Sequence, residues 1–178
     1  MRKQMLFLAA LLFISLGAIA QKKSKASSGK QFQVYAVGFY NQENLFDTCH
    51  DAGKNDYEYL PAKGWNGMKY TNKLKNMSRA LADMGTDVLP NVGCAFIGLA
   101  EVENANVLKD LTAQPPLKAR NMQFCHVEGP DKRGIDCALL YNPALFTVKN
   151  VKLVPYVQEL EKDSAFMTRG FLTVRGEM

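Results

Sequence analysis

Two apolar stretches decide the fold of this chain: residues 34–40 (VYAVGFY) and residues 94–100 (CAFIGLA). Each contains only apolar residues and glycine, and each is followed by a polar residue, Asn41 after the first and Glu101 after the second. Uninterrupted apolar runs of this length are typical of strands that are buried on both faces. In open α/β sheets, ligands bind just beyond the carboxyl ends of such strands. The two runs therefore predict a site with an amide and a carboxylate, which would suit a divalent cation and a phosphate.

The rest of the chain predicts further helices and strands around these two runs. Residues 70–84 carry an apolar stripe with spacings of three and four, which predicts a helix. Asn104 is suited to cap a second helix that reaches Leu111. Four later segments have the pattern of strands: 122–127, 135–141, 146–154 and 171–175. This order predicts an α/β domain whose strand-rich part needs a covering layer.

The N-terminus has the form of a targeting signal. Residues 1–20 combine Arg2 and Lys3, an apolar core and a final Ala-Ile-Ala, which together predict a cleaved signal peptide. The alternative is a transmembrane helix, but the apolar run is shorter than the ~20 residues that a bilayer requires. Since no cysteine follows the cleavage position, we expect no lipid anchor. The sequence thus predicts an exported protein, periplasmic or secreted, without a stable membrane anchor after cleavage.

The formal net charge of +5 is concentrated in the N-terminal segment. Residues 1–31 hold six Lys or Arg and no acidic residue, so the remainder has 16 basic residues against 17 acidic ones. Residues 21–31 are rich in Ser, Gly and Lys, which predicts a basic flexible linker. The body therefore lacks the overall positive field that would steer a polyanion toward it.

The four cysteines indicate no metal site of their own. None of Cys49, Cys94, Cys125 and Cys137 belongs to a C-x-x-C pair, so the spacing disfavours a cysteine zinc site. Cys125 and Cys137 lie on neighbouring predicted strands, and an oxidising compartment would allow them to pair. Buried free thiols are the alternative.

Three motifs resemble the endonuclease/exonuclease/phosphatase superfamily: residues 41–47 (NQENLFD), 98–104 (GLAEVEN) and 133–142 (RGIDCALLYN). The resemblance covers residues 32–178. It implies a deoxyribonuclease-like four-layer α/β/β/α sandwich whose members hydrolyse phosphodiesters or phosphomonoesters with magnesium. Substrates in the superfamily include nucleic acids, lipid head groups and small phosphodiesters.

The resemblance also implies that the domain is truncated. The family places a His, an Asp-x-Asn motif and an Asp-His pair in a second half, and neither His50 nor His126 lies in such a context. Residues 175–177 resemble the start of a hairpin, and one residue follows them. We therefore expect the N-terminal half of the domain, inactive or weakly active. The alternative is a non-catalytic remnant or fragment that retains a metal or phosphate pocket.

Within the motifs, Glu101 matches the family's metal ligand, and it implies Mg²⁺ as the cofactor with Mn²⁺ as a possible substitute. Asn41 matches an active-site amide that positions metal, water or phosphate. Each residue has a structural alternative. Glu101 would be an exposed glutamate at the start of a loop, and Asn41 would close its strand with an Asx-turn. Glu103 is expected to point to the other face, solvated or structural.

Arg133 and Asp136 flank the start of a predicted strand. A strand antiparallel to the first two would begin at the edge where those strands end, which would direct Asp136 toward the site as a catalytic residue and allow Arg133 to contact a phosphate. The alternative is an Arg–Asp pair that stabilises a turn. His126 and Arg169 are weaker candidates, for the cleft and for phosphate respectively.

Overall fold

A computed structural model describes residues 32–160 and 164–178 of the chain. It contains a compact unit, Val34–Met178, and the fold below is that of this unit. The predicted signal peptide (1–20) and linker (21–31) lie outside the described residues. Among the described helices, none is both long and apolar enough to cross a membrane.

A four-stranded mixed sheet forms the centre of the unit. Its strands are β1 (Ala36–Leu45), β2 (Cys94–Val102), β3 (Gln123–His126) and β4 (Asp136–Tyr141), in the order β1-β2-β4-β3. β1 and β2 are parallel, whereas β4 runs antiparallel to both of its neighbours. The carboxyl ends of β1 and β2 therefore meet the start of β4 at one edge of the sheet.

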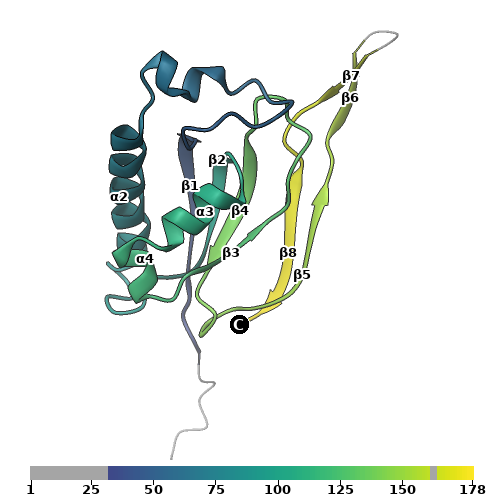
Figure 1. Ribbon diagram of the computed structural model, residues 1–178. Helices are drawn as coiled ribbons and strands as arrows, with labels where there is room; N and C mark the ends of the chain where they lie inside the picture. Colours follow the sequence, from purple (N-terminus) through teal and green to yellow (C-terminus); the bar gives the residue numbers. More distant parts are fainter. Residues whose placement is uncertain (1–31, 161–163) are drawn as a thin grey trace, which may run out of the picture. The chain divides into compact units, whose positions relative to one another are not determined.

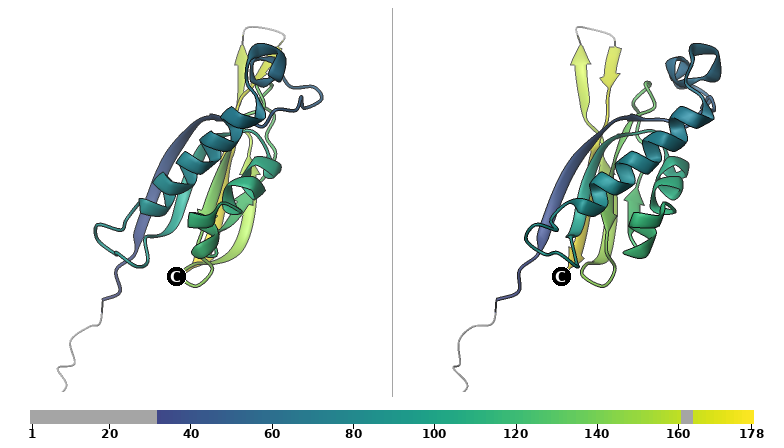
Figure 2. Two further views of the ribbon diagram at one scale, coloured as in Figure 1. Left: turned by 60° about the vertical axis from the view of Figure 1, so that its left-hand side comes forward. Right: turned by 90° about the vertical axis from the view of Figure 1, so that its left-hand side faces the viewer.

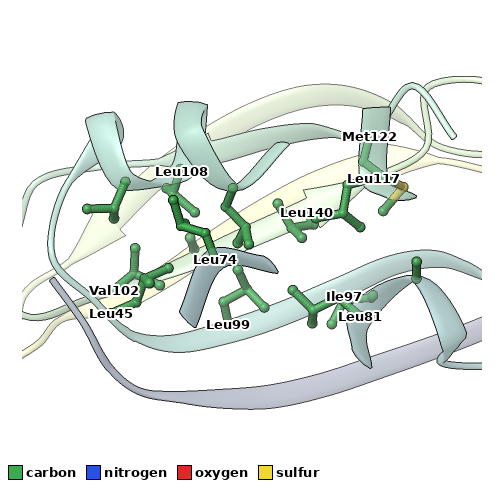
Figure 3. Close-up of a cluster of buried hydrophobic side chains, with 14 of the residues drawn as sticks. Leu45, Leu74, Leu81, Ile97, Leu99, Val102, Leu108, Leu117, Met122 and Leu140 are labelled. Carbon is green, nitrogen blue, oxygen red and sulfur yellow. The ribbon is translucent and has the colours of Figure 1, made fainter. Parts of the chain in front are cut away.

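Helices cover one face of this sheet. They are α2 (Gly67–Asp83), α3 (Ala105–Thr112) and α4 (Pro115–Ala119), with two short 3-10 turns, η1 (Tyr57–Tyr59) and η2 (Pro61–Lys63), before α2. Leu74 and Leu81 of the predicted stripe are buried, and Asn104 caps α3 as expected. Figure 3 shows these leucines packed with side chains of β2, β4, α3 and α4 in one apolar core.

A second, antiparallel pair of strands lies on the opposite face of the sheet (Figures 1 and 2). It consists of β5 (Thr147–Val154) and β8 (Phe171–Glu177). A short hairpin of β6 (Val157–Leu160) and β7 (Ser164–Met167) connects them, and the sequence pattern did not predict it. The α/β class is confirmed. The predicted hairpin start at 175–177 is wrong, because these residues continue β8.

The expectation that both apolar runs are buried on both faces holds for β2 but is wrong for β1. Every residue of β2 is buried or half-buried. In β1, Val37 is 58% exposed and Phe39 is 67% exposed. β1 is an edge strand, and its outer face borders an apolar cavity of about 660 Å³ between the two sheets. Phe39, Phe96, Phe171 and Val174 are among the residues that line it.

Candidate functional site

The predicted amide and carboxylate lie at the same edge of the sheet. Asn41 pairs with Ala100 in the parallel ladder, so Glu101 follows directly beside it. Neither strand ends at these residues as predicted, since β1 continues to Leu45 and β2 to Val102. Both strands instead become irregular there, with register shifts after Asn41 and after Ala100. The site is thus built from two bulges, which redirect side chains at the edge of a sheet.

Glu101 adopts a left-handed backbone conformation, with φ of 62°. This conformation is uncommon for a residue other than glycine and is often found at functional sites. The Glu101 side chain is 22% exposed, and its Oε1 lies 3.7 Å from Nη1 of Arg169. Glu101 is therefore a partly accessible carboxylate next to a cation. Arg169, a weaker candidate from the sequence, lies directly beside Glu101.

Asn41 forms the Asx-turn that was its structural alternative. Its Oδ1 accepts a hydrogen bond from the backbone N–H of Glu43 at 2.8 Å. The side chain is nevertheless exposed, and an amide oxygen has a second lone pair. The turn therefore fixes the amide at the edge of the sheet while leaving acceptor capacity on Oδ1.

Lys73 of α2 supports the bulge in β1, and sequence analysis missed it. Glu43 and Asn44 are both left-handed, with φ of 50° and 61°. The Nζ of Lys73 donates to both of their carbonyl oxygens, and the bond to Asn44 is 3.0 Å long. Burial lowers the pKa of Lys73, while Glu43 and Glu101 oppose that shift. The position of Lys73, beside Leu74 in the apolar stripe, is the signal that would have identified it.

Asp136 does not pair with Arg133. Its Oδ2 lies 3.1 Å from Nε2 of His126 and accepts a hydrogen bond from the N–H of Gly129, also at 3.1 Å. The side chains of Asp136 and His126 are both buried. The structural alternative, an Arg133–Asp136 pair, is therefore wrong, and Asp136 stabilises the connection between β3 and β4.

Arg133 pairs with Asp131 instead. Its Nε and Nη2 donate to the two oxygens of that carboxylate, at 3.1 and 2.7 Å. Burial raises the pKa of Asp131, but hydrogen bonds from Arg133 outweigh it and hold that pKa below its usual value. The Arg133 side chain remains 59% exposed. It is therefore a fixed cation with an open side, as a phosphate contact requires.

Glu103 is buried rather than solvated, and it stabilises the segment that follows β1. Its Oε2 accepts a hydrogen bond from the N–H of Asp47 at 2.7 Å. The indole of Trp65 donates to the carbonyl oxygen of Asp47, also at 2.7 Å. These two bonds hold the chain where it leaves β1.

Burial raises the pKa of Glu103 to about 8, and nearby acidic groups contribute. Since the folded state then binds the proton more tightly than the unfolded state, stability falls as the pH rises from about 4.5 to about 8. Glu103→Gln keeps an oxygen acceptor and removes the titration. We expect the variant to be more stable than the wild type at pH 8.5, by on the order of 3 kcal/mol.

Urea denaturation at pH 5 and at pH 8.5 measures this difference. The exposed Glu177 provides the control, because Glu177→Gln removes a carboxylate without altering the buried one. Equal pH dependence in the wild type and Glu103→Gln would contradict the assignment.

The four cysteines are free thiols, and Cys49 is exposed. Cys125 is buried and Cys137 is half-buried, which agrees with the alternative of unpaired thiols. Burial raises the pKa of Cys125 and of Cys137. Neither thiol is therefore activated as a nucleophile.

The site as a whole combines one accessible carboxylate with an amide and several cations. Glu101 and Asn41 supply oxygen atoms for a hard cation, while Arg133 and Arg169 supply positive charge for an anion. In the part of the chain that the structure describes, a separate group of three ligands is formed by His126, Glu128 and Asp136, and Glu101 stands outside it. The arrangement around Glu101 is suited to binding a metal-associated phosphate.

Comparison with known proteins gives one match. A family model described as Endonuclease/Exonuclease/phosphatase family matches residues 36–178. The matched range includes every residue of the site described above. No curated protein and no solved structure matches the chain.

Proposed function

Because the chain belongs to the Endonuclease/Exonuclease/phosphatase family, we propose that it is a metal-dependent phosphoesterase domain that acts at the edge of the β1–β2 pair. In this proposal Glu101 binds Mg²⁺, with Mn²⁺ as a substitute, and Asn41 positions the phosphate or the attacking water. The observation that carries the proposal is the strained, partly accessible Glu101 beside Arg169, next to Asn41 in the parallel ladder.

The residues present are compatible with Mg²⁺. This ion is usually bound through one or two carboxylates, with water and phosphate oxygens in the remaining positions. Glu101 supplies the carboxylate, and Asn41 Oδ1 is an additional oxygen. A bound divalent cation supplies Lewis-acid polarisation of a phosphoryl oxygen.

The protein's own residues hold the substrate. Arg133 and Arg169 place two guanidinium groups near Glu101, where they neutralise charge on a phosphoester. Asp131 keeps the Arg133 guanidinium oriented. Asp136 acts indirectly, by fixing the connection that carries Arg133, instead of reaching the substrate itself.

The complete fold, the location and the substrate class of this protein are proposed from its family membership and its N-terminal sequence. We infer a four-layer sandwich of which this chain supplies the N-terminal half, and export to the periplasm or the medium. A phosphate ester of a nucleic acid, a lipid head group or a small phosphodiester is the substrate.

A non-catalytic binding role is the second candidate, and the positions of the histidines favour it. His50 pairs with Asp56 and His126 pairs with the buried Asp136. General acid–base assistance contributes roughly 10²–10⁴-fold to hydrolysis. Because both histidines are already paired with carboxylates, we expect the chain to bind metal and phosphate but to hydrolyse slowly.

The Glu101→Gln variant tests the proposal. We expect it to weaken Mn²⁺ binding by about 10-fold or more, because it removes the charged ligand. Slow magnesium-dependent hydrolysis of bis-p-nitrophenyl phosphate should fall to background in the same variant. Calorimetric titration with Mn²⁺ and a colorimetric assay measure the two effects.

Glu177→Gln is the matched control, since it removes an exposed glutamate that pairs with Lys149. Unchanged Mn²⁺ affinity in Glu101→Gln would overturn the metal assignment. Binding without any hydrolysis would select the second candidate, and rapid Glu101-dependent turnover would show that the expectation of weak activity is wrong.

A further inference from the structure

A second group of ligand atoms lies where β3 passes into β4. His126 is the last residue of β3, Asp136 is the first residue of β4, and Glu128 lies in the connection. His126 pairs with Ala138 across the ladder, so His126 and Asp136 lie on the same face of the sheet. The ligand atoms of all three side chains lie within 4.8 Å of one another.

Two of these ligands are already held in place. His126 Nε2 and Asp136 Oδ2 are 3.1 Å apart. Adjacent ligands of one ion, each about 2.1 Å from it, are separated by roughly 3.0–3.4 Å. The N–H of Gly129 donates to Asp136 Oδ2, and a bond of this kind orients a metal-ligating carboxylate.

The backbone leaves room for the same carboxylate. A side chain at position 129 would place its Cβ 2.3 Å from Asp136 Oδ1. Glycine at this position therefore allows the carboxylate to occupy the space beside the connection.

The third ligand is open to solvent and is paired with a lysine. The Glu128 side chain is half exposed, and its Oε1 lies 2.8 Å from Nζ of Lys54. Lys54 Nζ also donates to the backbone oxygens of Gly129 and Asp131. A side-chain cation thus neutralises Glu128 beside the connection, and the exposed Glu128 gives an ion a route of entry.

We propose that His126, Glu128 and Asp136 form a Zn²⁺ site distinct from the site at Glu101. One imidazole nitrogen and two carboxylate oxygens suit Zn²⁺, whereas Mg²⁺ and Ca²⁺ favour oxygen ligands alone. Zn²⁺ displaces Lys54 from Glu128 and joins the ends of the connection that carries Arg133. Its role is to stiffen this connection, and the proposal is independent of the phosphoesterase function.

Zn²⁺ binding to the full chain tests the proposal, measured by competition with a chromophoric chelator. The wild-type background and all variants carry Cys49→Ser, because an exposed thiol can bind Zn²⁺ on its own. Glu128→Gln is expected to weaken Zn²⁺ binding by about 10-fold or more. Lys54→Met is expected to strengthen binding several-fold, because it removes the competing cation.

The exposed pair Lys149–Glu177 supplies matched controls, in the variants Lys149→Met and Glu177→Gln. Neither control should alter Zn²⁺ affinity. Zn²⁺ should also raise the melting temperature of the wild type more than that of Glu128→Gln. A dissociation constant above about 1 mM for the wild type would overturn the proposal. Equal affinities in Glu128→Gln and Glu177→Gln would overturn it as well.

Discussion

Leu140→Ala is expected to lower the free energy of unfolding by about 3–5 kcal/mol, among the largest effects of any single substitution in this chain. Leu140 is fully buried in β4, between β2 and β3. Its side chain belongs to the core beneath the helices (Figure 3). The substitution removes buried apolar atoms and leaves a cavity in a core that cannot close around it. Since domains of this size are stable by only about 5–15 kcal/mol, the variant should be largely unfolded well below the wild-type midpoint.

Leu139→Ala is the matched control because it changes the same residue type at the next position of the same strand. Leu139 points to the opposite face, where it is half-buried and lines the cavity between the sheets. We expect a loss of less than about 1.5 kcal/mol, because much of this side chain already contacts solvent. Urea denaturation followed by far-ultraviolet circular dichroism gives both values. Equal losses at the two positions would show that the helices do not define the principal core.

Association in solution is the second large effect that we expect. The cavity between the sheets is lined mainly by apolar side chains, including Phe39 and Phe171, which are 67% and 63% exposed. Contiguous apolar surface of this kind marks an interaction site or an aggregation liability. Sedimentation velocity at micromolar concentrations should therefore show associated species for the wild-type chain.

The double variant Phe39→Ser/Phe171→Ser should shift the chain toward the monomer, because it makes two exposed positions at the cavity polar. Val88→Ser is the control, since Val88 is 64% exposed but does not line the cavity. A monomeric wild-type chain with a cooperative thermal transition would contradict this prediction. Equal dissociation in the control would show that general solubility, and not this face, governs association.

The features that the sequence predicted correctly depend on local signals. The apolar run of β2, the stripe of α2 and the Asn104 cap each depend on residues close together in the chain. The proximity of Asn41 and Glu101 was also predictable, because the carboxyl ends of parallel strands meet at one edge.

The features that it did not predict depend on tertiary partners. The apolar run of β1 has the composition of a buried strand, but its exposure depends on what covers the outer face of the sheet. The partner of Arg133 depends on how the connection folds, since Asp131 and Asp136 are both near in sequence. Likewise, Lys73 approaches the bulge only after α2 has docked against the sheet.

Because Lys73 belongs to α2, the backbone conformation at the site depends on the packing of this helix against the sheet. Two consecutive left-handed residues, Glu43 and Asn44, are held by a donor from a different element of the fold. Any partial opening that lifts α2 from the sheet removes that donor and releases the strain next to Asn41. At the proposed site, ligand affinity is therefore expected to depend on how often the helix detaches, so a substitution on the buried face of α2 should weaken binding without altering a ligand-contacting residue.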